Sequence, residues 1–189
     1  MKRLWIVLTA LALTASAASA DAPGGPIAVF ADPLGENCYP EFIAPGLFQV
    51  YVVHLNHPGM TASAFKVAAD GEFNGVYLGE YPTDPNDITV GYAYAGITVA
   101  YGTCEPAPIA LLTMSFYVPG SPKKCCYFSV VEHPWEGLTA VNCDFVQVPA
   151  EGGTSYVEPD GSCPCDIPGV TTPVQASTWG KVKSLYTRD

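Results

Sequence analysis

The sequence predicts an all-β protein: a disulfide-stabilised β-sandwich followed by a short C-terminal helix. Three observations predict it. The apolar runs are short and rich in Val, Ile, Tyr, Phe and Thr, as in strands. Gly, Pro and Asn separate them at intervals of roughly ten residues, a spacing typical of two-sheet sandwiches. The chain also holds 7 cysteines in 189 residues, which points to stabilisation by disulfides.

Ten strands are expected from these runs. In chain order they cover Ile27–Ala31, Phe48–Leu55, Ala62–Ala68, Gly75–Gly79, Ile88–Tyr92, Ile97–Tyr101, Ile109–Val118, Cys126–Glu132, Leu138–Val148 and Ser155–Glu158. In "FKVAAD" the alternation places Phe65 and Val67 on one face, opposite Lys66. The segment "PIALLTMSFYV" is apolar on both faces, which favours a central strand. No helix is expected before residue 175.

The first twenty residues have the three parts of a secretory signal. Lys2 and Arg3 are followed by an apolar run and then by Ala18-Ser19-Ala20, a small-x-small cleavage site. The apolar run is shorter than the roughly 20 residues needed to cross a bilayer. We therefore expect cleavage before Asp21 and a secreted location, extracellular, periplasmic or at the cell surface, with no transmembrane segment after cleavage.

The mature chain divides into a sandwich domain (21–167), a linker rich in Pro and Thr (168–176) and a tail (177–189). The net charge of −10 makes nucleic-acid binding improbable, because such a chain repels phosphate backbones. The tail "STWGKVKSLYTRD" differs, since it is basic. Its apolar side chains follow helical spacing and form one stripe that could dock on a surface: Trp179, Val182, Leu185 and Tyr186.

The cysteines are expected to form disulfides, as in exported proteins. They are Cys38, Cys104, Cys125, Cys126, Cys143, Cys163 and Cys165. Because their number is odd, at least one is left over, and the pairing stays open. Strand order suggests that Cys104 lies near Cys125 and Cys126, that Cys143 lies near Cys163 and Cys165, and that Cys38 takes whichever remaining thiol is near the N-terminal strand. The adjacent Cys125 and Cys126 are expected to bond to different partners.

Two groups of residues are candidate metal ligands. Asp84, Asn86 and Asp87 in "TDPNDITV" offer the oxygen ligands that calcium prefers, although the EF-hand pattern is absent and a Pro/Asn/Asp turn explains them as well. His54, His57 and His133 could bind zinc or copper, but their spacing matches no zinc signature. Packing or surface positions are the alternative for these histidines, and no cofactor is expected.

Catalytic patterns are missing from the sequence. There is no G-x-S-x-G elbow, no phosphate-binding Gly loop and no CxxC redox motif, while Glu132, Glu136 and Asp144 are scattered. Aromatic residues crowd one region and could stack on sugar rings, or simply pack in the sheets. They are Tyr77, Tyr81, Tyr92, Tyr94 and Tyr101.

Three stretches, "VYVVHLNHPGMTASAFKVA", "ITVGYAYAGITVAYGTC" and "PIALLTMSFYV", together resemble the cohesin-like and immunoglobulin-like β-sandwich modules of exported bacterial proteins. The order "C…CC…VVEHP…VNCDF…DGSCPC…STWGKVKSLY" is similar to uncharacterised secreted bacterial proteins that end in a W-G-x-[IV]-K-x-L-Y segment. This resemblance covers most of residues 26–186, and the tail motif is its most specific part. It implies a fold but carries over no catalytic residues.

The function expected from the sequence is that of a secreted, non-enzymatic module that acts through protein–protein contact and that could belong to an assembly. A carbohydrate-binding module is the alternative, and a hydrolase with an unrecognised site is a third. The tail could pack on its own domain, dock in another protein or serve as a sorting signal.

Overall fold

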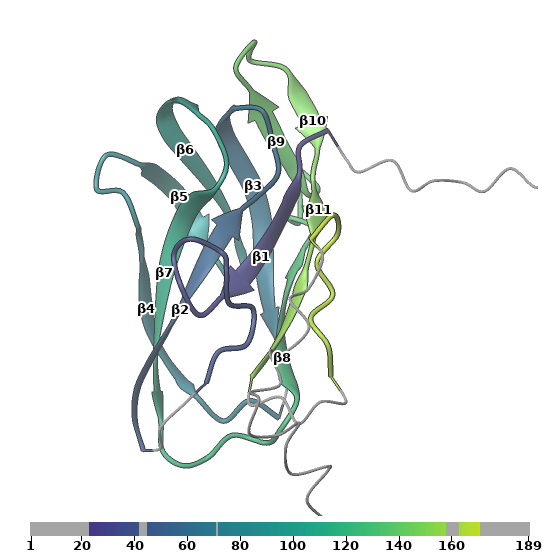
Figure 1. The fold of residues 1–189 in the computed structure, drawn as a ribbon. Coiled ribbons are helices and arrows are strands. Elements are labelled where there is room, and N and C mark those ends of the chain that lie inside the picture. The colour runs from purple at the N-terminus through teal and green to yellow at the C-terminus, as the bar shows by residue number, and fades with distance from the viewer. Residues whose placement is uncertain (1–22, 42–44, 71, 158–162, 171–189) are drawn as a thin grey trace, which may run out of the picture.

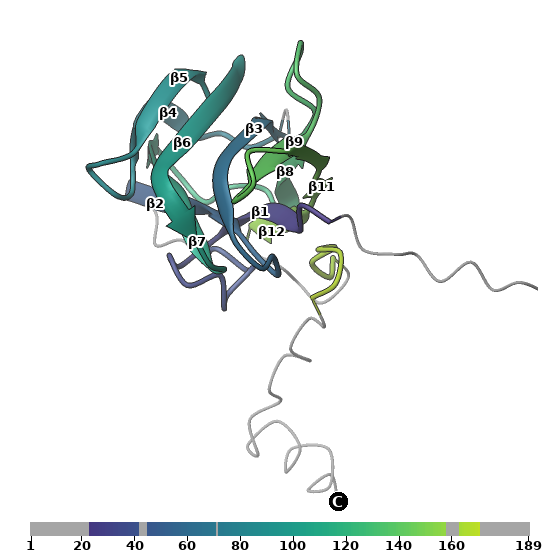
Figure 2. The ribbon, with the colours of Figure 1, turned by 90° about the horizontal axis from the view of Figure 1, so that it is seen from above.

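The computed structural model describes residues 23–41, 45–70, 72–157 and 163–170. These residues form a sandwich of two β-sheets, with β1 and β2 in front of β3 and β6 in the view of Figure 1 and two layers visible from above in Figure 2. No helix occurs in the described residues, and so none there could span a membrane. The predicted signal (1–20), most of the predicted linker and the whole predicted tail lie outside the described residues.

The front sheet has the strand order β11-β1-β2-β7-β4. Its strands are β11 (Glu151–Gly152), β1 (Pro26–Phe30), β2 (Gly46–His54), β7 (Ile109–Val118) and β4 (Val76–Pro82). The back sheet has the order β10-β9-β3-β6-β5, and β8 joins it by pairing with both β3 and β12. Its strands are β10 (Gln147–Pro149), β9 (Thr139–Asn142), β3 (Met60–Ala69), β6 (Gly96–Glu105), β5 (Ile88–Tyr92), β8 (Cys126–Val131) and β12 (Thr154–Val157).

Most of the expected strands are present within a few residues of their predicted bounds, and β5 and β7 match them. The single strand expected over Leu138–Val148 is wrong: the chain reverses between β9 and β10. The side chain of Asn142 causes the turn, since its Oδ1 accepts hydrogen bonds from the backbone N–H groups of Asp144 at 3.0 Å and Val146 at 2.9 Å. Asn and Asp favour such turns because their side chains bond to the backbone two residues on.

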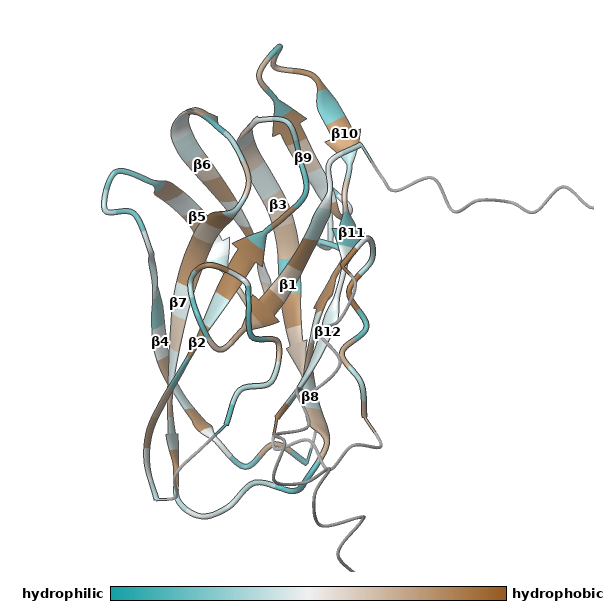
Figure 3. Ribbon diagram, viewed as in Figure 1, coloured by the Kyte–Doolittle hydropathy of each residue, from teal (hydrophilic) through white to brown (hydrophobic). Residues whose placement is uncertain are grey.

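The main core lies between the sheets, where the inward residues of β2, β3, β6 and β7 interdigitate. Figure 3 shows that hydrophobic residues concentrate in these strands. The predicted faces are confirmed, because Phe65 and Val67 are buried while Lys66 is only half-buried. Strand β7 pairs on both sides, with β2 and with β4, as its apolar sequence predicted.

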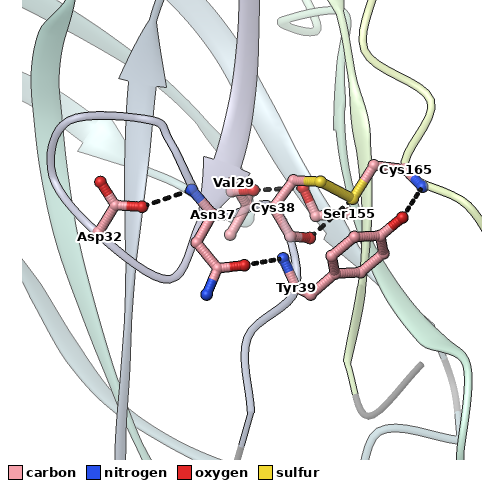
Figure 4. Close-up of a disulfide and its surroundings, with 7 residues drawn as sticks. All are labelled: Val29, Asp32, Asn37, Cys38, Tyr39, Ser155 and Cys165. Atoms are coloured by element: carbon pink, nitrogen blue, oxygen red, sulfur yellow. Dashed lines mark hydrogen bonds between the residues drawn. A yellow bond between two sulfur atoms is a disulfide. The ribbon is translucent and has the colours of Figure 1, made fainter. Parts of the chain in front are cut away.

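A second, smaller cluster covers the outer side of β1, which explains why every residue of β1 is buried. The disulfide between Cys38 and Cys165 lies in this cluster (Figure 4). The hydroxyl of Tyr39 accepts a hydrogen bond from the backbone N–H of Cys165 at 3.3 Å, and Ser155 donates one to the carbonyl of Val29. These bonds fix the segments on either side of β1 against it.

The disulfide between Cys104 and Cys143 corrects the pairing expected for Cys104. Strand β6 lies between β3 and β5 and does not pair with β7, so the end of β6 is not adjacent to the Cys125–Cys126 pair. Met60 of β3 instead pairs with Glu105 on one side and Asn142 on the other. The bridge therefore crosses the start of β3.

The third disulfide joins Cys125 to Cys163. The expected nearness of Cys143 to Cys163 and Cys165 is thus wrong. The expectation that both adjacent cysteines form bridges is also wrong, because Cys126 is outside all three disulfides. Cys125 lies in the turn before β8 with a positive φ of 62°, while Cys126 begins the strand and points into the main core. The three bridges fit an oxidising compartment.

Candidate functional site

Strand β5 presents its apolar side chains to solvent. Ile88, Val90 and Tyr92 are 66%, 69% and 70% exposed, while Thr89 on the opposite face is half-buried. The pairing with β6 enforces this orientation, since Ile88 lies opposite Ala100 and Val90 opposite Thr98. Strand β5 is an edge strand, so this apolar face is exposed at the border of the back sheet.

Small residues continue this outer face across the back sheet. Ala100 of β6 pairs with Ala62 of β3, and Ala62 pairs with Val141 of β9. In the next row Thr98 pairs with Ala64, which pairs with Thr139. Because Ala and Thr side chains are short, the middle of the sheet is lower than its two borders.

Two adjoining hollows lie along these rows. One, of about 410 Å³, is lined by Thr61, Ala62, Ala100, Gly102, Thr103, Cys104, Val141, Cys143 and Phe145. The other, of about 360 Å³, is lined by Ala62, Ser63, Ala64, Thr98, Glu136, Thr139, Val141 and Gln147. They share Ala62 and Val141, so together they form one groove, which we call the back groove.

The borders of the back groove combine apolar and acidic side chains. Phe145, at the β9–β10 turn, is exposed. Glu136 reaches the floor, where its carboxylate accepts a hydrogen bond from the hydroxyl of Thr98 at 3.3 Å. Trp135, beside Glu136 in the loop before β9, is 87% exposed. Asp144 and Glu105 stand near the other end, next to Cys143 and Cys104. The groove can thus take an apolar segment that carries positive charge.

The calcium candidates form a turn before β5. The carboxylate of Asp84 accepts hydrogen bonds from the backbone and side-chain nitrogens of Asn86, both at 2.8 Å. Asp87 is buried, and burial, followed by the charges of Asp84 and Glu105, raises its pKa to about 6. No group of three or more His, Cys, Asp or Glu side chains within the described ranges is placed to hold a metal ion. Calcium binding stays a prediction.

His54 belongs to a buried polar network in the core. Its Nε2 donates to the carbonyl of Gly24, and so the neutral ring accepts at Nδ1, which lies 3.0 Å from the hydroxyl of Tyr101 and 3.1 Å from that of Ser63. Burial, with the neighbouring His57, lowers the pKa of His54 to about 3. His54 and Ser63 are both closed to solvent. Both ring nitrogens of His54 are occupied, Nδ1 by the hydroxyls and Nε2 by the carbonyl of Gly24, so the pair resembles that of a hydrolase only in its residue types.

The other two histidines, His57 and His133, also pack or form hydrogen bonds within the fold. The ring of His57 lies 4.2 Å from that of His54, centroid to centroid, and burial lowers its pKa to about 4. Nδ1 of His133 accepts hydrogen bonds from the backbone N–H groups of Trp135 at 3.4 Å and Glu136 at 3.2 Å. His133 therefore shapes the loop that borders the back groove.

The tyrosines do not form the exposed row that sugar stacking requires. Tyr77 and Tyr94 pack edge to face with ring centroids 5.1 Å apart, and Tyr101 is buried. Tyr81 and Tyr92 are exposed but belong to different sheets. This arrangement favours packing over a carbohydrate platform.

No protein-family model matches the chain. No curated protein matches it either. Among solved structures, it is similar to a cohesin module from a family 33 glycoside hydrolase of Clostridium perfringens, with 8% identity and a TM-score of 0.49 over 71% of this chain and 98% of that one. A non-cellulosomal cohesin from the hyperthermophilic archaeon Archaeoglobus fulgidus gives 14% identity and a TM-score of 0.44 over 73% and 91% of the two chains.

A chain of the CaDoc0917–CaCohA2 complex gives 11% identity and a TM-score of 0.43 over 70% of this chain and 98% of that one. All three similarities are distant, and none decides what this chain binds. The resemblance to secreted proteins with a W-G-x-[IV]-K-x-L-Y end stays a prediction.

The back groove was not anticipated from the sequence. The alternation of Ile88, Val90 and Tyr92 in "ITVGY" would ordinarily assign these residues to a buried face. One signal was available: the opposite positions, Thr89 and Gly91, are polar or lack a side chain. The face of β5 that carries Thr89 and Gly91 therefore has few apolar atoms to bury in a core.

Proposed function

We propose that this protein is a secreted, non-enzymatic module that acts through protein–protein contact, with the back groove as its contact surface. The observation that carries the proposal is the outward orientation of Ile88, Val90 and Tyr92 beside a floor of small residues. Burying such side chains contributes about 25 cal/mol per Å² of apolar surface. The three disulfides support secretion, because they need an oxidising compartment.

The proposal is tested by capture experiments with the full mature chain on medium in which its source has grown. Ala100→Arg places a long charged side chain in the groove. Ser115→Arg is the matched control, since Ser115 is also a small, half-buried strand residue but faces outward from β7 of the front sheet. Proteins retained by the mature chain and by Ser115→Arg should be lost from Ala100→Arg. Equal recovery by all three chains would refute the groove as the contact surface.

The same variants address the carbohydrate alternative. Binding to polysaccharide beads that survives Ala100→Arg and protein depletion, but is lost in Tyr92→Ala or Trp135→Ala, would replace the proposal with sugar binding. We expect no retention on the beads.

A further inference from the structure

We infer that the back groove is occupied in its own molecule by the basic C-terminal segment 177–189, which inserts Trp179 and its apolar neighbours. The inference rests on the proposed function and describes a regulation of the same surface: the segment covers the groove until a protein partner displaces it. It has three supports: the chemistry of the groove, the charge of the segment and the length of chain that joins them.

The chemical fit concerns apolar contact. The groove floor is formed by small side chains, such as Ala62 and Ala100, and the exposed Phe145 lines it as well. The exposed Val90 pairs with Thr98, which lines the second hollow. A surface of this shape suits a segment with large side chains on one face. Segment 177–189 has such side chains at helical spacing: Trp179, Val182, Leu185 and Tyr186.

The charges are complementary. The described residues hold only three basic side chains, Lys66, Lys123 and Lys124, and Lys123 is paired with Glu72 away from the groove. Among the acidic residues, Glu136 lines the groove and Glu105 accepts a hydrogen bond from Thr103 of its lining at 3.1 Å. Asp144 directly follows Cys143, another lining residue. Segment 177–189 supplies Lys181, Lys183 and Arg188 against the single Asp189. Opposite charges at a partly buried contact favour association and fix its orientation.

The connection is long enough. The carbonyl of Gly169 accepts a hydrogen bond from the side chain of Asn56 at 3.2 Å, and Thr61, which lines the groove, follows Asn56 by five residues. The backbones of Asn56 and Thr61 are therefore at most about 18 Å apart. Residues 171–178 can span about 30 Å when extended. Figure 2 shows residues 163–170 beside β1 and β12, on the front side of the sandwich.

An intramolecular occupant has an advantage over a second copy. A short linker that spans the two sites gives an effective concentration of about millimolar, which exceeds the concentration of a second copy in dilute solution. The front sheet also has exposed apolar residues, Leu47, Val76 and Tyr117. The acidic residue lining its hollow, Glu80, already accepts hydrogen bonds from Tyr77 and from the backbone of Ala93, so it offers less to a basic segment.

Tryptophan fluorescence tests the inference in the full mature chain. The mature chain from Asp21 contains two tryptophans, Trp135 and Trp179, and Trp135→Phe removes the exposed one and leaves Trp179 as the reporter. We expect emission at a shorter wavelength than that of free tryptophan and weak quenching by acrylamide, both independent of dilution. Ala100→Arg in this background should shift the emission to longer wavelength and raise quenching several-fold, while Ser115→Arg should change neither.

Each other result has a definite meaning. Exposed-type emission in every variant overturns the inference, and the proposed function then still stands or falls on the capture experiment. Exposure caused by Ser115→Arg instead would place the segment on the front sheet and also overturn it. Shielding that is lost on dilution, with a matching change in molar mass by light scattering, would make the occupant the segment of a second copy, against the intramolecular contact inferred here.

Discussion

The Nδ1 atom of His54 lies 3.0 Å from the hydroxyl oxygen of Tyr101, and both side chains are buried between the sheets. Ser63 bonds to both, so three side chains from β2, β3 and β6 form one network. Because buried polar groups are costly unless they are paired, this network specifies how the two sheets face each other.

Tyr101→Phe should lower the free energy of unfolding by about 1 kcal/mol, because a hydrogen bond is lost while the ring remains. Ser63→Ala should have a similar effect, and the double variant should lose less than the sum, since the residues share a partner. Urea denaturation measures all three. Tyr92→Phe, at an exposed position, is the control; strict additivity would argue against a shared network.

His57→Phe should stabilise the protein by about 1 kcal/mol at pH 7, because both ring nitrogens of His57 are buried without a hydrogen-bond partner. It should also change the acid response. The folded pKa of His57, about 4, is below the ordinary value of 6.5. Protonation of His57 therefore favours the unfolded state, and the free energy of unfolding decreases as pH falls from 6.5 toward 4. Thermal unfolding between pH 7 and 4 should show a smaller decline in the variant, and a parallel decline would contradict this account.

Asp87→Asn should have the opposite pH signature. The folded pKa of Asp87, about 6, is above its ordinary value, so the folded state binds the proton more tightly and stability rises as pH falls from 6 toward 4. The variant should therefore be more stable than the parent above pH 6 and lose this difference near pH 4. Thermal unfolding of the variant and the parent between pH 7 and 4 measures this difference; a difference that stays constant with pH would contradict the account.

The disulfides should differ in their contribution. Replacing both Cys38 and Cys165 by Ala opens a loop with a separation of 127 residues, which predicts a loss of about 5 kcal/mol in the chain-entropy model. Replacing Cys104 and Cys143 opens one with a separation of 39, for about 4 kcal/mol. The first pair is also buried, which adds a packing loss, so guanidinium denaturation should rank it as the larger effect.

Cys126 should give one reactive thiol per chain, and only after unfolding. It is outside the three disulfides and buried in the main core, and burial in apolar surroundings makes a thiol inert. Titration with a thiol reagent in buffer should show little reaction, and guanidinium without reductant should expose a single equivalent. Fast reaction of the native protein would mean that the core at β8 opens easily.

The Cys104–Cys143 bridge lies directly over Gly59, which immediately precedes β3, and its pairing could not be predicted from the sequence. A Cβ atom at Gly59 would lie 2.8 Å from the sulfur of Cys143 and 3.0 Å from that of Cys104, so the bridge needs a glycine beneath it. Nothing in the spacing of cysteines along the chain reveals that β3 lies between β6 and β9. That information is in the strand order, which depends on contacts distant in sequence.

The sequence by itself determined the all-β class, most strand positions and the inward faces of residues such as Phe65, because strand periodicity and turn residues are local properties. Only the tertiary structure decided the disulfide pairs, the burial of His54 with Ser63, and the outward orientation of Ile88, Val90 and Tyr92. Each depends on which strand lies beside which, and a shift of one residue in register would turn every side chain of β5 to the other face. The proposed contact surface therefore exists because of the pairing of β5 with β6, and not because of its amino acids alone.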